Sequence, residues 1–221
     1  MCHPYGMTKT GTLIRDKDDA GLTKGERTRR RLMDAALALL GEVGFHDLKT
    51  TEIARHAGVA AGVFYTYFAD KNEIVLALMD EMIARNTDIV LGAPHEDDHF
   101  KAVLSANRAY IALFVKGRGL NRAIGQIVDT LPDARIAWQK ANAEIAQRIA
   151  RRMERRLGPG PHDVDLFFGA LALQAMLDSV LLQTYAYRDP ALADFAGDPD
   201  ALAMQLSVLW YRAVYGASPK V

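Results

Sequence analysis

Apolar residues recur along this chain at the three- and four-residue spacing of amphipathic helices, and no segment alternates apolar and polar residues as a strand would. A capping-box pattern at Thr23 and Glu26 predicts the start of the first long helix, which Gly44 ends. The same reasoning predicts further helices over residues 51–57, 61–67, 70–91, 99–116, 121–129, 132–157, 163–187 and 198–216. The predicted fold class is therefore all-α, with about nine helices.

Residues 50–69 have the pattern of a helix-turn-helix, in which two short helices cross steeply and the second is free to enter a major groove. Ala54 supplies the small residue that a tight crossing needs, and Gly58 tolerates the positive φ of the turn. Ile53, Phe64 and Tyr67 stand at positions suited to burial between the helices. These features predict a DNA-binding unit in the N-terminal part of the chain.

The stretch TTEIARHAGVAAGVFYTYFADKNEIVLAL, residues 50–78, resembles the signature of the TetR (tetracycline-repressor) family. The matching residues are Thr50, Thr51, Ile53, Ala54, Ala57, Gly58, Val59, Gly62, Phe64, Tyr65, Phe68 and Lys71. The resemblance covers about residues 24–80, and the later helices match the family in number, order and length. It implies a helix-turn-helix DNA-binding domain over 23–70 and a helical ligand-binding and dimerisation domain over 71–221. Residues 1–22 are polar and lack periodicity, which predicts a flexible arm.

The resemblance also implies roles at a double-stranded DNA operator. The implied DNA-binding residues are Thr50, Thr51, Ala61, Gly62, Tyr65, Thr66, Tyr67 and Lys71. The threonines and the lysine are expected at phosphates, Tyr67 is expected to combine packing with a phosphate contact, and the others are expected to face the groove. Ala60 departs from the Ser or Thr usual at the start of the second helix, and that helix has no charged base reader. Van der Waals contact and DNA shape are therefore expected to carry much of the specificity.

Arginines near the start of the first long helix are further candidates for phosphate contacts. They are Arg27, Arg29, Arg30 and Arg31.

The predicted helix over 163–187 is apolar nearly all round, so it must be covered on both sides. The last helix, 198–216, carries two apolar stripes. Two such helices at the C-terminal end favour a two-fold homodimer, which the TetR resemblance also implies. Such a dimer would present two recognition helices to half-sites about 34–36 Å apart.

Isolated polar or aromatic residues on the apolar helices are candidates for the wall of a ligand pocket. They are Asn107, Tyr110, Phe114, Gln126, Trp138, Asn142, Gln174 and Asp178. Buried polar groups need partners, which are either a ligand or another side chain. The apolar surroundings favour a small, largely hydrophobic effector that releases the protein from DNA by population shift. Repression is what the family resemblance implies.

Composition limits the remaining function classes. The 221 residues include 27 basic and 27 acidic side chains, so a chain that coats nucleic acid along its whole surface is not expected. The single cysteine, Cys2, cannot form a disulfide within one chain, and no run of about 18 apolar residues free of polar ones occurs. We therefore predict a cytoplasmic protein without a membrane span. No enzyme signature or cofactor-binding loop is present, so neither catalysis nor a cofactor is predicted.

His95-Glu96-Asp97-Asp98-His99 matches the H-E-x-x-H pattern of zinc peptidases, which lies in the middle of a helix. Here the pattern follows the helix breaker Gly92-Ala93-Pro94 and lacks an evident third ligand, so a solvated connection is the first interpretation and no metal ligand is assigned. The alternative is a metal-responsive regulator or metal-dependent hydrolase that uses His95, Glu96 and His99.

Overall fold

The computed structural model describes residues 21–92, 98–158, 160 and 162–216, which form helices and no strand. Within these residues the helices are α1 (Lys24–Asp47), α2 (Thr50–His56), α3 (Ala61–Tyr67), α4 (Lys71–Gly92), α5 (His99–Lys116), α6 (Arg118–Thr130), α7 (Pro132–Leu157), α8 (Leu166–Leu181), the π-helix η2 (Leu182–Tyr187), the 3-10 helix η3 (Pro190–Leu192), α9 (Ala193–Gly197) and α10 (Pro199–Tyr215). The all-α prediction is confirmed. The short helices η3 and α9 were not predicted, and α6 begins three residues earlier than predicted.

Helix starts are fixed by the polar residues that the sequence places there. Thr23 and Glu26 form the predicted capping box, with the Thr23 N–H donating to Glu26 Oε2 at 2.8 Å. Asp70 accepts hydrogen bonds from the first-turn amides of α4, and Asp98 and Asp198 do the same for α5 and α10. Each cap satisfies backbone donors that have no partner within the helix.

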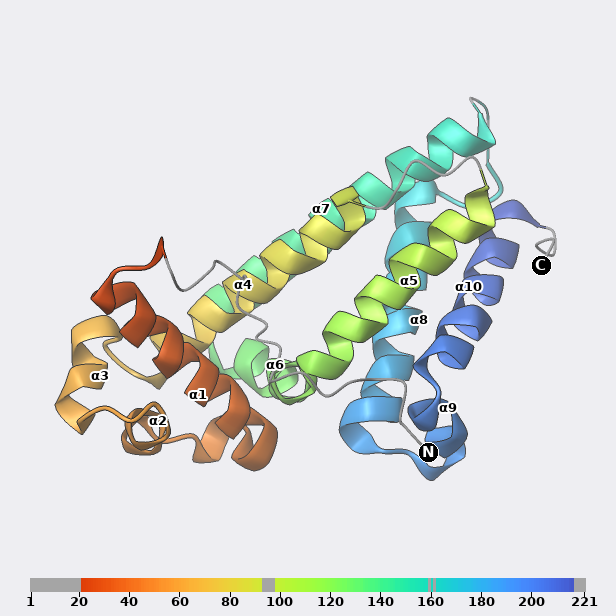
Figure 1. Ribbon diagram of the computed structural model, residues 1–221. Coiled ribbons are helices and arrows are strands. Elements are labelled where there is room, and N and C mark those ends of the chain that lie inside the picture. The colour runs from red at the N-terminus through yellow and green to blue at the C-terminus, as the bar shows by residue number, and fades with distance from the viewer. Residues whose placement is uncertain (1–20, 93–97, 159, 161, 217–221) are drawn as a thin grey trace.

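The helices form two lobes joined along the long helices α4 and α7 (Figure 1). Helices α1, α2 and α3 make the smaller lobe, and α5, α8, α9 and α10 make the far end of the larger one. Helix α6 lies between them and packs directly on α1. The smaller lobe therefore rests on the body through α4 and α6.

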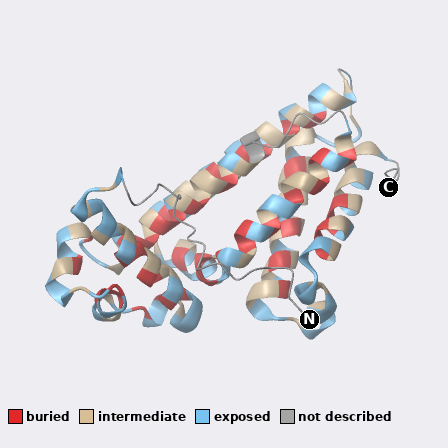
Figure 2. Cartoon of the chain, in the orientation of Figure 1, coloured by how far each residue is buried: buried red, intermediate tan, exposed pale blue. Residues whose placement is uncertain are grey.

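Buried side chains follow this arrangement (Figure 2). One core cluster joins α1–α4 to α6 and the start of α7, with Leu32, Phe64 and Leu120 fully buried in it. A second cluster joins α5, α8 and α10, and a third joins α7 to α8. The first cluster crosses residue 70, so the small lobe shares its core with α6.

The apolar helix predicted over 163–187 is divided into α8 and η2, and within one chain it is not covered on both sides. Phe168 is 64 % exposed. The continuous segment Leu166–Tyr187 is long and apolar enough to cross a membrane by length and composition alone, with a mean hydropathy of 1.6. Its polar residues Gln174 and Asp178 are hydrogen-bonded to α7 and α5, as in the core of a helical body.

Candidate functional site

Helices α2 and α3 cross around a turn that the predicted residues build. Ile53 and Ala54 are buried, and Gly58 has φ +65°, as its place in the turn requires. The Val59 amide donates to the Ala54 carbonyl at 3.0 Å and closes the turn.

Arg31 of α1 holds this turn from outside. Its guanidinium donates to the carbonyl oxygens of Ala57 and Gly58, the second at 3.3 Å. Sequence reasoning proposed Arg31 as a phosphate ligand and missed this bond, because nothing local indicates that a residue 26 positions away reaches the turn.

The outer face of α3 carries the predicted groove-facing residues. Ala61, Gly62, Tyr65 and Thr66 are all exposed, whereas Phe64 is fully buried. This division follows from the helical period, which turns Phe64 into the core while its neighbours face outward. Ala60 precedes the helix without a side-chain cap, as the departure from the family pattern indicated.

The two helices meet at their exposed ends through a hydrogen bond between side chains. Thr50 Oγ1 and the Tyr65 hydroxyl lie 3.1 Å apart. Tyr65 is 59 % exposed and Thr51 is exposed beside Thr50. The structure thus brings together a residue expected at a phosphate and one expected at the groove.

Lys71 lies at the start of α4, but its ammonium already has protein partners. It donates to the Phe45 and His46 carbonyl oxygens at 3.1 and 2.9 Å, and it lies 5.0 Å from the centre of the Phe45 ring. An ammonium has three N–H donors, so one remains for a phosphate.

Tyr67 is half-buried and packs against the first core cluster, in agreement with the packing part of its predicted role.

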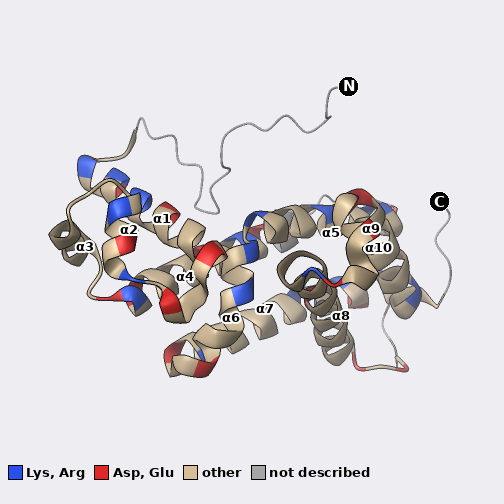
Figure 3. Cartoon of the chain, turned by 90° about the horizontal axis from the view of Figure 1, so that it is seen from below, with Lys and Arg blue, Asp and Glu red and all other residues tan. Residues whose placement is uncertain are grey.

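Basic side chains gather on the N-terminal half of α1 (Figure 3). Several already contact the protein itself. Arg27 donates to the Leu22 carbonyl at 2.6 Å, and the Arg29 guanidinium lies 5.0 Å from the centre of the Phe68 ring. These contacts hold the arginines along α1, next to the helix-turn-helix.

The proposed ligand residues do not form one group. Tyr110 donates to Asp178 at 2.5 Å between α5 and α8, and Phe114 packs in the same cluster. Burial raises the pKa of Asp178 to about 6, although the Tyr110 hydrogen bond opposes that rise. Burial, together with the Asp178 charge, raises the pKa of Tyr110 well above its ordinary value. Gln174 donates to Asn142 at 3.2 Å, and the Gln174 Oε1 atom is buried without a partner among the described residues.

The remaining ligand candidates lie elsewhere. Asn107 is buried and donates to Ser207 at 2.9 Å between α5 and α10, which is the side-chain partner that a buried amide needs. Gln126 and Trp138 lie toward the small lobe. Gln126 Oε1 accepts a hydrogen bond from the Phe45 amide at 3.2 Å, next to Gly44, where the backbone leaves the helical conformation at φ +76°.

Only one end of the H-E-x-x-H pattern can be placed. His95 and Glu96 lie outside the described residues, and His99 stacks on Tyr215 with ring centres 5.4 Å apart. In the part of the chain that the structure describes, no three His, Cys, Asp or Glu side chains gather as metal ligands would.

The comparisons with known proteins point to one family. Residues 32–78 match the family model of bacterial regulatory proteins, tetR family. This segment holds the whole α2–turn–α3 unit with the Ala54, Gly58 and Phe64 positions described above. Residues 32–78 therefore carry the DNA-binding segment typical of the tetR family.

Known proteins resemble this chain in sequence over a short segment and in fold over most of its length. The HTH-type transcriptional regulator BetI of Escherichia coli is 43% identical over 67 residues, which is 30% of this chain and 34% of that protein. This chain therefore matches about a third of the length of that relative. Salmonella enterica GusR superposes with a TM-score of 0.70 at 20% identity, covering 87% of this chain and 98% of that one. FadR from Bacillus subtilis, in complex with stearoyl-CoA, superposes with a TM-score of 0.63 at 17% identity, covering 85% and 98%.

Proposed function

We propose that this chain is a ligand-responsive transcriptional regulator, acting as a repressor, that binds a pseudo-palindromic operator as a homodimer and is released by a small, largely apolar effector. The observation that carries the proposal is the exposed face of α3, made of Ala61, Gly62, Tyr65 and Thr66, on a turn fixed by Arg31. A rigid helix with small residues and one aromatic ring on its outer face fits closely into a major groove.

The proposed phosphate contacts flank this face. Thr50 and Thr51 begin α2, and Lys71 keeps one N–H free at the start of α4. Phosphate contacts set the register of a protein on DNA, while groove contacts read its sequence. We therefore assign the threonines, Tyr67 and Lys71 to the backbone and the outer face of α3 to the bases.

The exposed apolar surface of α8 and α10 supports a homodimer. Phe168 and Leu209 are 64 % and 51 % exposed, although both lie on helices that are otherwise built into the core. Exposed large apolar side chains on these helices can be covered by the same surface of a second copy, related by two-fold symmetry. This cover also accounts for the apolar length of α8 in a protein that we place in the cytoplasm.

The effector is proposed to enter the helical body near the buried polar pairs. Gln174 Oε1 lacks a partner among the described residues, and Asp178, which accepts the hydrogen bond of Tyr110 from α5, lies one turn further along α8. The surrounding cluster is apolar, so a mainly hydrophobic molecule with one hydrogen-bond donor fits this chemistry.

Selection from random duplexes at two salt concentrations tests the operator proposal. Wild type should enrich a pseudo-palindrome and lose affinity steeply with salt. Tyr65→Ala should alter base preference, whereas Thr51→Ala should weaken all sequences alike and leave the salt slope unchanged, because the lost hydroxyl carries no charge. Ile136→Ala is the control, because Ile136 is 63 % exposed but lies on α7. If wild type enriches no sequence, the operator proposal fails.

A further inference from the structure

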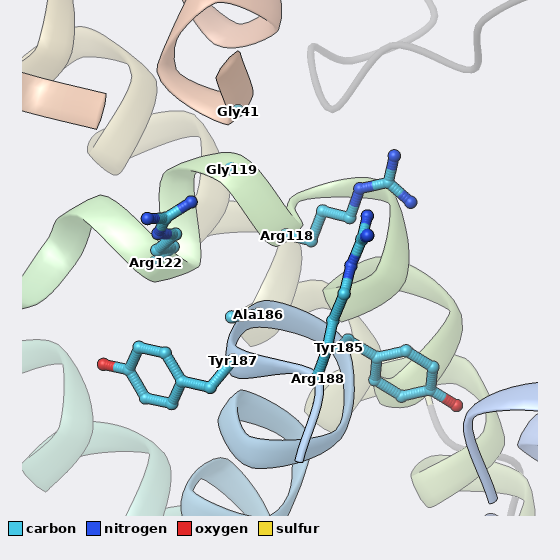
Figure 4. Close-up of a pocket in the computed structure, with 8 residues that line it drawn as sticks. All are labelled: Gly41, Arg118, Gly119, Arg122, Tyr185, Ala186, Tyr187 and Arg188. Carbon is cyan, nitrogen blue, oxygen red and sulfur yellow. The ribbon is translucent and has the colours of Figure 1, made fainter. Parts of the chain in front are cut away.

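A cavity of about 450 Å³ opens between α6, η2 and the C-terminal part of α1 (Figure 4). Its lining residues are Gly41, Arg118, Gly119, Arg122, Tyr185, Ala186, Tyr187 and Arg188. Arg118 and Arg122 come from α6, and Arg188 follows η2. In the close-up, the side chains of Arg118 and Arg188 extend in the same direction, toward the side of the cavity where α1 lies. This volume is in the range of small-molecule sites in proteins.

Among the described residues, the three arginines have no partner of opposite charge. None of them makes a hydrogen bond or ion pair with any residue that the structure describes. Arg118 and Arg122 are four residues apart on one helix, where like charges repel each other. Arg188 adds a third charge from a left-handed backbone position, φ +56°, which is unfavourable for a residue with a side chain. A multiply charged anion would relieve the repulsion.

We propose that this cavity, the arginine pocket, binds a small organic phosphate. Guanidinium groups match phosphate oxygens with paired hydrogen bonds, and three of them suit a group that carries more than one negative charge. Tyr187, which also lines the pocket and is 59 % exposed, provides an aromatic surface for the organic part of the ligand. The pocket is separate from the buried Tyr110–Asp178 and Asn142–Gln174 pairs assigned to the apolar effector.

The pocket adjoins the contact between the small lobe and the body. Gly41 of α1 and Gly119 of α6 both line it, and their backbones are so close that a Cβ on Gly119 would lie 2.5 Å from the Gly41 nitrogen. A ligand that bridges α6 and η2 beside this contact would restrain the position of α1. An effect of this restraint on operator affinity rests on the proposed function, whereas binding of the phosphate itself does not.

Calorimetric titration at constant ionic strength, without DNA, tests the site with inorganic pyrophosphate and with ADP. Arg188→Gln should weaken pyrophosphate binding at least fivefold, and the triple Arg118, Arg122 and Arg188 to Gln variant should abolish it. Arg155→Gln is the charge-matched control, because Arg155 is exposed near the end of α7. The pyrophosphate affinity of this variant should stay within twofold of the wild-type value. ADP should bind more tightly than pyrophosphate, and Tyr187→Ala should remove that advantage.

Backbone amide shifts of wild-type protein give a second measurement that no variant's stability affects. Pyrophosphate should move the Gly41 and Gly119 signals more than those of Gly125, which lies on α6 outside the pocket. The proposal is overturned if wild type and the triple variant bind pyrophosphate equally, or if Arg155→Gln weakens binding as much as Arg188→Gln. It is also overturned if wild type ignores pyrophosphate while the triple variant shows a lower salt slope on DNA, which would make the arginines operator contacts.

Operator DNA gives the regulatory readout. If the pocket is coupled to the small lobe, saturating ADP should change operator affinity, and operator should change ADP affinity by the same factor. Phosphate binding without this reciprocal change would leave the site intact and reject only the coupling. If the wild-type protein binds pyrophosphate but no operator, the proposed function is rejected and the phosphate site is retained.

Discussion

One methyl group added at Gly119 should push helices α1 and α6 apart, because Gly119 of α6 lies against the backbone of Gly41 in α1. A Cβ added there would meet the Gly41 nitrogen at 2.5 Å and the Leu40 carbonyl carbon at 3.2 Å, and both are backbone atoms that no rotamer change can move. Ordinary contacts are about 3.5 Å or longer, so α1 and α6 would have to move apart by roughly 1 Å. Gly119→Ala should therefore lower the free energy of unfolding by about 1–3 kcal/mol, despite the better helix propensity of alanine.

The matched control lies on the same helix. A Cβ on Gly125 would meet nothing within 4 Å, so Gly125→Ala should raise the free energy of unfolding by about 0.5–1 kcal/mol. Urea denaturation followed by circular dichroism, at one protein concentration, measures both variants. In thermal scans each kcal/mol should shift Tm by about 2–4 °C in a chain of this size. If the two variants shift in the same direction by similar amounts, the close contact between α1 and α6 is not present in solution.

Three further predictions follow from individual side chains. Burial raises the folded-state pKa of Asp178 to about 6, so the folded state holds the Asp178 proton more tightly than the unfolded state does. The free energy of unfolding should therefore fall as pH rises from about 4 to 6. Asp178→Asn should flatten this pH dependence in urea denaturation measured across the same range. Lys71→Met should lower unfolding stability by about 1 kcal/mol, because the Phe45 and His46 carbonyls lose a charged donor, and an unchanged urea midpoint would contradict this. Phe168→Asp should convert a dimer to monomers in analytical ultracentrifugation, and a dimer that survives would place the interface elsewhere.

Local pattern was enough to predict most of the fold. The helical period, the caps at Thr23 and Asp70, and the turn residue Gly58 all act over a few residues, and the structure shows each of them in the predicted place. At Gly44 the backbone leaves the helical conformation, but α1 continues to Asp47 and does not end at Gly44 as predicted. The exposed face of α3 follows from the same period. Helix α9 was missed because its five residues carry no periodic signal.

Long-range contacts could not be predicted from the sequence. Nothing near Gly119 indicates that it touches Gly41, which is 78 positions away, or that Arg188 shares a cavity with α6. The polar residues proposed as one ligand group lie at several separate helix–helix contacts. The helical period predicts which face of a helix is buried, but it does not predict which other helix packs against that face. Asn107 is an example, since its partner Ser207 lies 100 residues further along.

The core that α6 shares with α1 limits how this protein can be recombined. A hybrid that joins residues 23–70 to the body of another regulator would keep the DNA-facing residues, but it would lose the surface formed by Leu120 and Gly119. The transplanted segment would then lose the α6 surface beside Leu40 and Gly41 and would have no defined orientation on its new host. The smallest exchangeable unit therefore includes α6, so α1 and α6 are expected to diverge together among related sequences.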